Sequence, residues 1–550
     1  MKQAKSSVFL LTILWLLQVV AEGLTLAAVW RLDMLPAQYM LLLVAGLGLL
    51  LAFTGLLMLP GRKSGGGKFR RGLACVLVMA ICVGCAAVVT VVSDIYETLQ
   101  NVTDDPPQDM DLTSRSIYVR IDDLAQSPED LAGYTIGLVA GYDQANTAQA
   151  LTELAQVLGQ NPDTEPFANI AEMVEALYHG RVDAILLGDA NLAVLEEIYG
   201  DFYDQARLLH EVEFQLQTQP PTDPPTEPPT QPPTEPPTTL PGDPTEPTVT
   251  EPTVPVTQPP TEPPTEPPTE PPTEPPTTPP TQPPKEPVDV TEDTFIFYIA
   301  GSDTRSKRLS RSRNDVNILM VVNPRTKQIL LVNTPRDYYV ANYAGGGARD
   351  KLAHCGNYGI YNSMNALEWV YDVDVDFYGQ INFSGFETFI DAIGGVTVYS
   401  DEAFTAGNYP IQVGENYLTG KMALAFARER YNVSGGDNAR GRNQMKIIRA
   451  VIGKLTSGTT IITRYGEILD SLEGMFATDM SMEDLSKLVR MQLNDMAGWN
   501  IVSYAVRGYD AYTETYSAPG MDLYVMKPDW DTVAHAKSLI QRVVDGEILE

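Results

Sequence analysis

Aspartate and arginine side chains recur at short spacing in the second half of this 550-residue chain. Those that could act together are Asp303, Arg313, Asp315, Arg336, Arg428, Arg430, Asp437, Arg440 and Gln444. Guanidinium groups bind phosphate oxygens through paired hydrogen bonds, each worth about 1.5–3 kcal/mol. Two carboxylates without a nearby histidine favour a hard cation such as Mg²⁺. Taken singly, each residue would more often form a surface ion pair, but the set as a whole predicts phosphoryl transfer.

The segments around these residues alternate between two hydrophobic patterns, which predicts a layered α/β domain. Expected strands are Phe295–Ala300, Val316–Val322, Gln328–Val332, Val375–Ile381 and Val396–Tyr399. Expected helices are Gly359–Val370, Phe383–Ile393, a segment capped by Thr419 that ends near Ala427, and Arg440–Leu455. The charged residues lie where strands end, the usual position of ligands in such sheets.

The last of these helices would hold Arg440 and Gln444 one turn apart on the same face. A start near Asp437 would add the free backbone N–H groups of the first turn to an anion site.

Four phrases in this region resemble the catalytic domain of the LytR-CpsA-Psr family. They are "GSDTR", "SRNDVNILMVVNPRTKQILLVNTPRDYYV", "FYGQINFSGFETFIDAIGGVTVYSD" and "LTGKMALAFARERY". The resemblance runs from about Phe295 to the end of the chain. It implies a central sheet between helices, an α-β-α layering, with an apolar slot for a polyprenyl chain. It also implies a transferase that moves a phosphate-linked glycopolymer from undecaprenyl pyrophosphate to peptidoglycan.

The resemblance also assigns roles by position. Asp303 and Asp315 correspond to carboxylates that hold Mg²⁺, with Mn²⁺ as an alternative, and Asp437 to a residue that assists proton removal from the acceptor. The matching pyrophosphate-binding residues are Arg313, Arg336, Lys351, Arg428, Arg430, Arg440 and Gln444. Asp303, Asp315, Arg336 and Asp437 form the implied catalytic set. The family commonly has Arg-x-x-Arg-Gln where this chain has Arg440-Gly441-Arg442-Asn443-Gln444, so Arg442 receives no role.

Three apolar stretches near the N-terminus, Val8–Trp30, Gln38–Leu59 and Gly72–Val92, each approach the ~20 residues that cross a bilayer. Basic residues precede the first stretch and fill the loop between the second and third; they are Lys2, Lys5, Arg62, Lys63, Lys68, Arg70 and Arg71. The positive-inside rule therefore predicts a cytoplasmic N-terminus. After three crossings, the chain from about Ser93 onward is expected outside the cell membrane.

These features predict four parts: three spans over 1–94, an accessory domain over 95–216, a spacer over 217–287 and a catalytic domain over 288–550. The accessory part is expected to be a small α/β unit with strands at Gly133–Val139 and Val182–Leu187 and helices at Thr147–Leu158 and Ile170–Tyr178. Its phrases "DLAGYTIGLVAG" and "MVEALYHGRVDAILLGD" resemble one lobe of an extracellular solute-binding domain. A small ligand and a purely accessory role both stay open.

The overall charge argues against a polyphosphate partner such as nucleic acid. The chain has 70 acidic and 38 basic side chains and a formal net charge of −32, so its long-range field repels nucleic acid. A phosphate site must then come from a local basic cluster. Two other functions stay open: a membrane-anchored receptor or scaffold that binds the lipid or wall glycan without turnover, and a polyprenyl pyrophosphate hydrolase. The glycopolymer, whether teichoic acid, capsule or another wall glycan, also stays open.

Residues Thr218–Pro287 repeat units such as Pro-Pro-Thr-Glu. Proline removes backbone donors and the segment has little apolar surface to bury, which predicts a disordered, polyproline II spacer. At ~3.1 Å per residue it could extend roughly 200 Å. Such a spacer would let the catalytic domain work at a distant acceptor and return to its anchor for lipid.

Shortening Thr218–Pro287 to about half its length tests this hypothesis. We expect less glycopolymer on isolated cell walls and unchanged turnover of soluble substrates by the purified protein, because only the reach of the domain is altered. Unchanged attachment in cells would leave the spacer length without a functional role.

Overall fold

The computed structural model describes residues 2–59, 66–103, 112–140, 144–199, 201–215, 288–304, 309, 311–456 and 464–550. The spacer predicted over 217–287 lies outside these residues, as do Arg62 and Lys63 of the basic loop. The described residues belong to one compact unit that spans residues 1–224 and 288–550.

Three long helices form the N-terminal part: α1 (Lys2–Leu32), α2 (Ala37–Met58) and α3 (Gly66–Thr103). Each contains an apolar stretch long enough to cross a membrane, at the positions that the sequence predicts. Helix α3 continues past the predicted end at Val92, because polar residues mark where a helix leaves the bilayer but do not break it.

Buried polar side chains link α1 to α2. Gln18 Nε2 donates to Glu22 Oε1 (2.7 Å), and Thr54 Oγ1 donates to Gln18 Oε1 (2.8 Å). Hydrogen bonds of this kind satisfy polar groups that lipid cannot. Glu22 therefore has a structural partner within its own helix.

The accessory domain is a five-stranded sheet in the order β3-β2-β4-β1-β5. Its strands are β1 (Leu112–Arg120), β2 (Thr135–Val139), β3 (Asp163–Phe167), β4 (Ala184–Gly188) and β5 (Ala206–Gln215). Its helices are η2 (Pro128–Leu131), α4 (Gln144–Leu158), α5 (Ile170–Tyr178), α6 (Asp189–Ile198) and α7 (Phe202–Gln205). The apolar strands β2 and β4 match the prediction, whereas the polar strands β1, β3 and β5 have no clear signature in the sequence.

The catalytic domain is built on a six-stranded sheet in the order β16-β11-β6-β7-β8-β17. These strands are β6 (Phe295–Ser302), β7 (Asn314–Asn323), β8 (Gln328–Asn333), β11 (Phe377–Asn382), β16 (Phe476–Thr478) and β17 (Asn500–Ala505). The pairs β11–β6 and β8–β17 are parallel, and the other neighbouring pairs are antiparallel.

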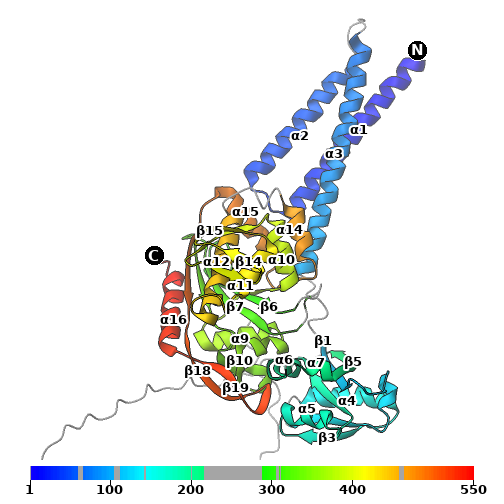
Figure 1. Ribbon diagram of the computed structural model, residues 1–550. Helices are drawn as coiled ribbons and strands as arrows, with labels where there is room; N and C mark the ends of the chain where they lie inside the picture. Colours follow the sequence, from blue (N-terminus) through cyan, green and yellow to red (C-terminus); the bar gives the residue numbers. More distant parts are fainter. Residues whose placement is uncertain are drawn as a thin grey trace, which may run out of the picture. The chain divides into compact units, whose positions relative to one another are not determined.

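Helices cover both faces of this sheet. Residues of α9 (Ile360–Tyr371) and α16 (Trp530–Val544) pack in one core cluster with Tyr298 and Ala300 of β6. On the other side lie α10 (Phe383–Ala392), α11 (Gly420–Arg428), α12 (Gly436–Thr456), α14 (Tyr465–Leu472) and α15 (Met482–Asp495). Alternate β6 residues, Phe297 and Ile299, face that second layer. The domain therefore has the predicted α-β-α layering (Figure 1).

Smaller elements complete the domain, and one of them confirms a strand that the sequence predicts. The hairpins are β9 (Tyr339–Asn342) with β10 (Ala348–Lys351), β12 (Val396–Ser400) with β15 (Gly414–Leu418), β13 (Phe404–Ala406) with β14 (Tyr409–Ile411), and β18 (Gly508–Thr515) with β19 (Ala518–Pro528). Short helical turns are η3 (Tyr343–Gly345), α8 (Leu352–Cys355) and η4 (Gly356–Tyr358). The strand expected at Val396–Tyr399 thus pairs outside the central sheet, because an alternating pattern predicts a strand but not its partner.

Strand register brings the charged segments to one edge of the sheet. Ser302 at the end of β6 pairs with Asn382 at the end of β11 and with Asn314 at the start of β7. Asn333, at the end of β8, pairs with Ile318 in the middle of β7, and the next residue, Thr334, donates its backbone N–H to the carbonyl of Asn317. Since neighbouring strands lie about 4.8 Å apart, the residues that follow β6 and β8 and those that begin β7 share one site.

Helix α11 reaches this edge through a close approach to α10. The bond that caps α11 comes from Asp391 Oδ1, which accepts from the backbone N–H of Gly420 (2.7 Å), and not from the hydroxyl of Thr419 as predicted. A Cβ at Gly420 would overlap the backbone carbonyl oxygen of Glu387 on α10. Glycine is therefore needed at this crossing.

A pair of glycine substitutions tests the crossing. We expect Gly420→Ala to lower the free energy of unfolding by at least about 1–3 kcal/mol, because backbone cannot move aside as a side chain can. Gly453→Ala in α12, where a Cβ meets nothing within 4 Å, should instead stabilise the protein by about 0.5–1 kcal/mol. Thermal unfolding of both variants in detergent measures the difference, and equal Tm values would contradict the assigned contact.

Candidate active site

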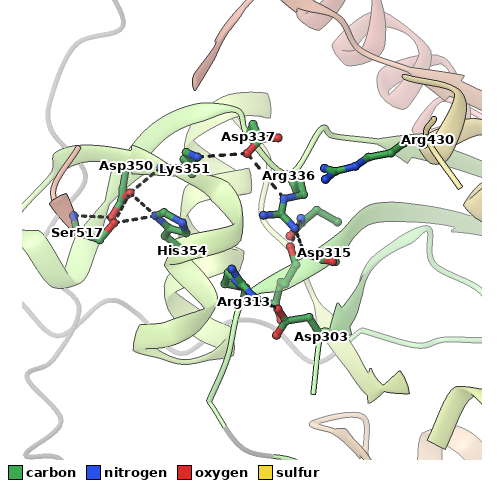
Figure 2. A network of polar contacts seen from close by, with 12 residues as sticks. Asp303, Arg313, Asp315, Arg336, Asp337, Asp350, Lys351, His354, Arg430 and Ser517 are labelled. Carbon is green, nitrogen blue, oxygen red and sulfur yellow. Dashed lines mark hydrogen bonds and ion pairs between the residues drawn. The ribbon is translucent and has the colours of Figure 1, made fainter. Parts of the chain in front are cut away.

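Two Asp–Arg pairs form the centre of the site at the sheet edge. Asp303 Oδ2 accepts from Arg313 Nε (2.8 Å) and contacts Arg313 Nη2 (2.6 Å), and Asp315 Oδ1 contacts Arg336 Nη1. All four side chains are only 14–18% exposed. Burial raises the pKa of Asp303 above its ordinary value, and the charge of Asp315 adds to this effect, against the opposing attraction of Arg313. Figure 2 shows the two pairs side by side.

The partly buried Asp337 connects this centre to Lys351. Asp337 Oδ1 lies 3.7 Å from Arg336 Nε and also 3.7 Å from Lys351 Nζ. Lys351 is only 1% exposed and does not line the cavity described below, so its charge acts on the site through Asp337 and Arg336. Sequence reasoning gave Asp337 no role, although its position next to Arg336 was a usable signal.

Behind Lys351 lies a fully buried cluster of Asp350, His354 and Ser517. Ser517 Oγ donates to Asp350 Oδ1 (2.9 Å) and lies 2.7 Å from His354 Nδ1. Asp350 also accepts from the backbone N–H of Lys351 (2.8 Å). The three residue types could form a nucleophilic triad, but the hydroxyl is bound to the carboxylate and closed to solvent. The cluster therefore fixes the Lys351 loop and is not a second catalytic centre.

The second group of arginines comes from α11, α12 and the turn between them. Arg428 stacks on the ring of Phe383 (4.5 Å to its centroid), and Figure 2 shows Arg430 pointing toward Arg336. Arg440 and Gln444, both 6% exposed, come from the first turns of α12. Gln444 Nε2 also donates to the carbonyl of Ala427 at the end of α11 (3.5 Å).

The structure also shows where Asp437 and Arg442 lie along α12. The helix begins at Gly436, so Asp437 lies in its first turn, as predicted; the side chain of Asp437 lies outside the part that the structure describes. Arg442 is exposed, and its Nη2 donates to the carbonyl of Ser434 (3.1 Å), away from the other arginines.

One cavity of about 730 Å³ joins these groups to the second helical layer. At one end its lining is polar and consists of Asp315, Arg336, Arg428, Arg430, Arg440 and Gln444. The remaining lining is almost entirely apolar and comes from β6, β7, β11, β16, the helices α10, α11, α12, α14 and α15, the link between α1 and α2, and α3. Asp303, Arg313 and Lys351 lie beside the polar end without lining it. A ligand with an anionic head and a long apolar tail matches this division.

Glu429 holds the turn that carries Arg428 and Arg430. Its carboxylate is 8% exposed and accepts from the backbone N–H groups of Tyr431 (2.9 Å) and Asn432 (2.9 Å). Burial alone would raise the pKa of Glu429, but the N–H groups of Asn432, Tyr431 and Gly407 together hold it below its ordinary value. Sequence reasoning missed this residue because an acidic side chain between two arginines resembles a local ion pair.

Fold and site together define an α/β protein with a group of arginines at one end of an apolar cavity. The chain belongs to the LytR-CpsA-Psr family (LytR_cpsA_psr family), whose model matches residues 277–528. It is a transferase of that type.

Named relatives agree with this assignment. The chain is 35% identical over 227 residues to the polyisoprenyl-teichoic acid–peptidoglycan teichoic acid transferase TagU of Oceanobacillus iheyensis. This match covers 40% of this chain and 68% of the relative. It is 32% identical over 199 residues to TagU of Enterococcus faecalis, and this match covers 36% of this chain and 65% of the relative. Among solved structures, Bacillus subtilis TagV matches 46% of this chain and 98% of its own, at 22% identity and a TM-score of 0.39.

The role of Glu429 predicts a pH-dependent effect on stability. Its folded pKa is lowered, so its contribution is present above the ordinary value of 4.5 and is lost as the pH falls through the folded pKa. We expect Glu429→Gln to lower the free energy of unfolding by about 1–3 kcal/mol at pH 7 and to weaken donor binding through Arg428 and Arg430.

Thermal unfolding in detergent at pH 7 and pH 4 measures this contribution. The difference in Tm between wild type and variant should shrink at pH 4, because this pH lies below the ordinary value of 4.5 and the carboxyl of the unfolded chain then binds a proton. A difference that stays constant across this range would show that the carboxylate charge does not hold the turn.

Proposed function

We propose that this protein transfers a phosphate-linked glycopolymer from undecaprenyl pyrophosphate to peptidoglycan on the outer side of the cell membrane. The observation that carries the proposal is the single cavity with guanidinium groups at one end and apolar side chains along the rest. A diphosphate suits the first part and a polyprenyl chain suits the second. The relatives named as polyisoprenyl-teichoic acid transferases support teichoic acid as the glycopolymer.

The arginines would bind the diphosphate from two sides. Arg336 belongs to the loop after β8, while Arg428, Arg430 and Arg440 come from α11, α12 and the turn between them. Bidentate guanidinium contacts from separate elements fix the orientation of the phosphates as well as neutralising them. The four groups would therefore hold the phosphorus atom that is nearest to the glycan at the polar end of the cavity.

The reaction would begin with attack of a muramyl hydroxyl on this phosphorus. The new P–O bond joins glycan phosphate to peptidoglycan, and the bond to the bridging oxygen breaks, so undecaprenyl phosphate leaves with that electron pair. The hydroxyl proton would pass to Asp437, the residue that the family resemblance assigns to this step. Guanidinium groups already in place stabilise the charge that develops on the phosphate oxygens.

Asp303 and Asp315 offer a site for Mg²⁺. Among the described residues no group of three or more His, Cys, Asp or Glu side chains surrounds a common point. Mg²⁺ commonly binds one or two carboxylates together with substrate phosphates, so a pair is sufficient. The two carboxylates lie near enough for Asp315 to raise the pKa of Asp303, and a divalent cation between them would relieve that repulsion. When bound, Mg²⁺ would neutralise charge on the diphosphate.

Substitution of one cavity arginine tests the reaction. We expect Arg336→Ala to lower kcat/KM roughly 10²–10³-fold, because it removes a preorganised charged donor from the reacting phosphate. The assay uses the full-length protein in detergent, a short-chain polyprenyl-pyrophosphate saccharide and a peptidoglycan fragment, with product detected by mass spectrometry. Arg442→Ala is the matched control, since this exposed arginine points away from the cavity, and it should retain wild-type activity.

The products separate the proposal from its alternatives. Saccharide phosphate linked to peptidoglycan supports the transferase, whereas free saccharide phosphate identifies a hydrolase. Donor binding without either product, in the presence of Mg²⁺, would identify a receptor and overturn the proposal. Equal loss of activity in both variants would show that the effect is one of total charge.

A further inference from the structure

The apolar cavity ends at residues that belong to the membrane anchor. Its lining includes Met34, from the link between α1 and α2, and Leu99, near the end of α3. Met34 is 6% exposed and Leu99 is 7% exposed, so other side chains cover both of them. Leu485 and Val489 of α15 also line the cavity, and Val489 packs in the same apolar cluster as Met34 and Leu99. The cavity therefore runs from the arginines of the catalytic domain to the anchor.

Specific contacts join the anchor to α15 at this end. Met34, Ile95 and Leu99 form an apolar cluster with Met482 and Val489 of α15. Ser486 Oγ donates to the carbonyl of Leu32 (3.2 Å).

An ion pair adds a fixed point to the same contact. Arg490 Nη1 lies 2.6 Å from Asp33 Oδ1. Asp33 has a positive φ of +50°, which lets the chain turn directly between α1 and α2. The link that carries Met34 is thus held by polar bonds as well as by packing.

The order of the spans places these residues at one membrane surface. Met34 follows the first apolar stretch, which ends at Leu32, and Leu99 lies at the end of the third, which ends at Gln100. After one crossing and after three crossings the chain is on the same side of the bilayer, whichever side that is. Both residues therefore lie at the surface on which the catalytic domain sits.

We propose that Met34 and Leu99, together with Leu485 and Val489, form a portal through which the apolar tail of the donor lipid passes between the bilayer and the cavity. This inference rests on the proposed function and extends it to the anchor, which becomes part of the lipid-binding site. The occupant is an amphiphile whose anionic head binds the arginines and whose tail is longer than the cavity. Its tail never has to cross water, because apolar side chains continue from the cavity to the spans.

The portal also gives the contact between anchor and catalytic domain a function. While α15 stays on α1 and α3, the apolar lining of the cavity continues to the membrane helices, and the lipid tail can load along it. A domain that extends on its spacer to reach an acceptor would have to release this contact after loading.

Donor chain length provides the test. Leu99→Trp and Met34→Trp each narrow the portal from a different element, in the full-length protein reconstituted in nanodiscs. We expect both to lower kcat/KM at least tenfold with a donor of eleven isoprene units and to leave a donor of two or three units unaffected, because a short tail does not reach the portal. Val91→Trp is the matched control, since Val91 is a 53% exposed residue on the same helix α3 and does not line the cavity.

The outcomes distinguish this inference from the proposed function. Wild-type protein that turns over neither donor refutes the proposed function, and with it the portal. Equal loss with long and short donors, or no loss with either, refutes the portal alone.

A binding measurement gives a second result that needs no turnover. A polyprenyl phosphate of eleven units with a photoreactive group at the end of its tail should cross-link to residues near Met34, Leu99 or Val489. We expect Leu99→Trp to abolish this cross-link and Val91→Trp to retain it. Cross-links confined to other parts of the chain would contradict the portal.

Discussion

The structure depends on keeping several guanidinium groups next to an apolar cavity without leaving their charges unpaired. Buried charge is costly unless it is paired and hydrogen-bonded. The protein pairs Arg313 with Asp303 and Arg336 with Asp315, and Asp337 lies between Arg336 and Lys351. Each carboxylate thus stabilises a positively charged arginine or lysine side chain next to the site. The chain can carry a net charge of −32 and still present a positive site, because the pairing is local.

The sheet provides the rigid frame for this arrangement. Strand register brings the ends of β6, β8 and β11 to the start of β7, and the helices α11 and α12 add their arginines from the other side of the cavity. Positions on the sheet are fixed by the backbone ladder, whereas the α11–α12 turn needs its own support. Glu429 provides this support by accepting backbone N–H groups, and Gly420 allows α11 to pack closely on α10. Residues with no direct contact to a substrate therefore decide where the arginines lie.

The contact between anchor and catalytic domain changes the role of the membrane helices. An anchor alone would need only enough apolar length to remain in the bilayer. Here the end of α1, the link that follows it and the end of α3 pack on α15 through apolar, hydrogen-bonded and ionic contacts, and Met34 of the link and Leu99 of α3 line the cavity. In the proposed portal, this contact connects the cavity to the bilayer.

The sequence by itself determined most of the elements and predicted the chemistry of the site. Apolar length determined the three spans, period-two and helical patterns determined most of the catalytic domain, and the residue types at strand ends predicted a phosphate site. Only the tertiary structure decided which charges share the cavity, that Lys351 acts from behind Arg336, and that Arg442 points away. It also placed Val396–Ser400 outside the central sheet. It showed that Asp337 lies beside Arg336, that Glu429 accepts backbone N–H groups, and that Met34 and Leu99 line the cavity. The reason is physical: local patterns record which face of an element is apolar, while strand pairing, close helix crossings and the partners of buried charges depend on residues far apart in the chain.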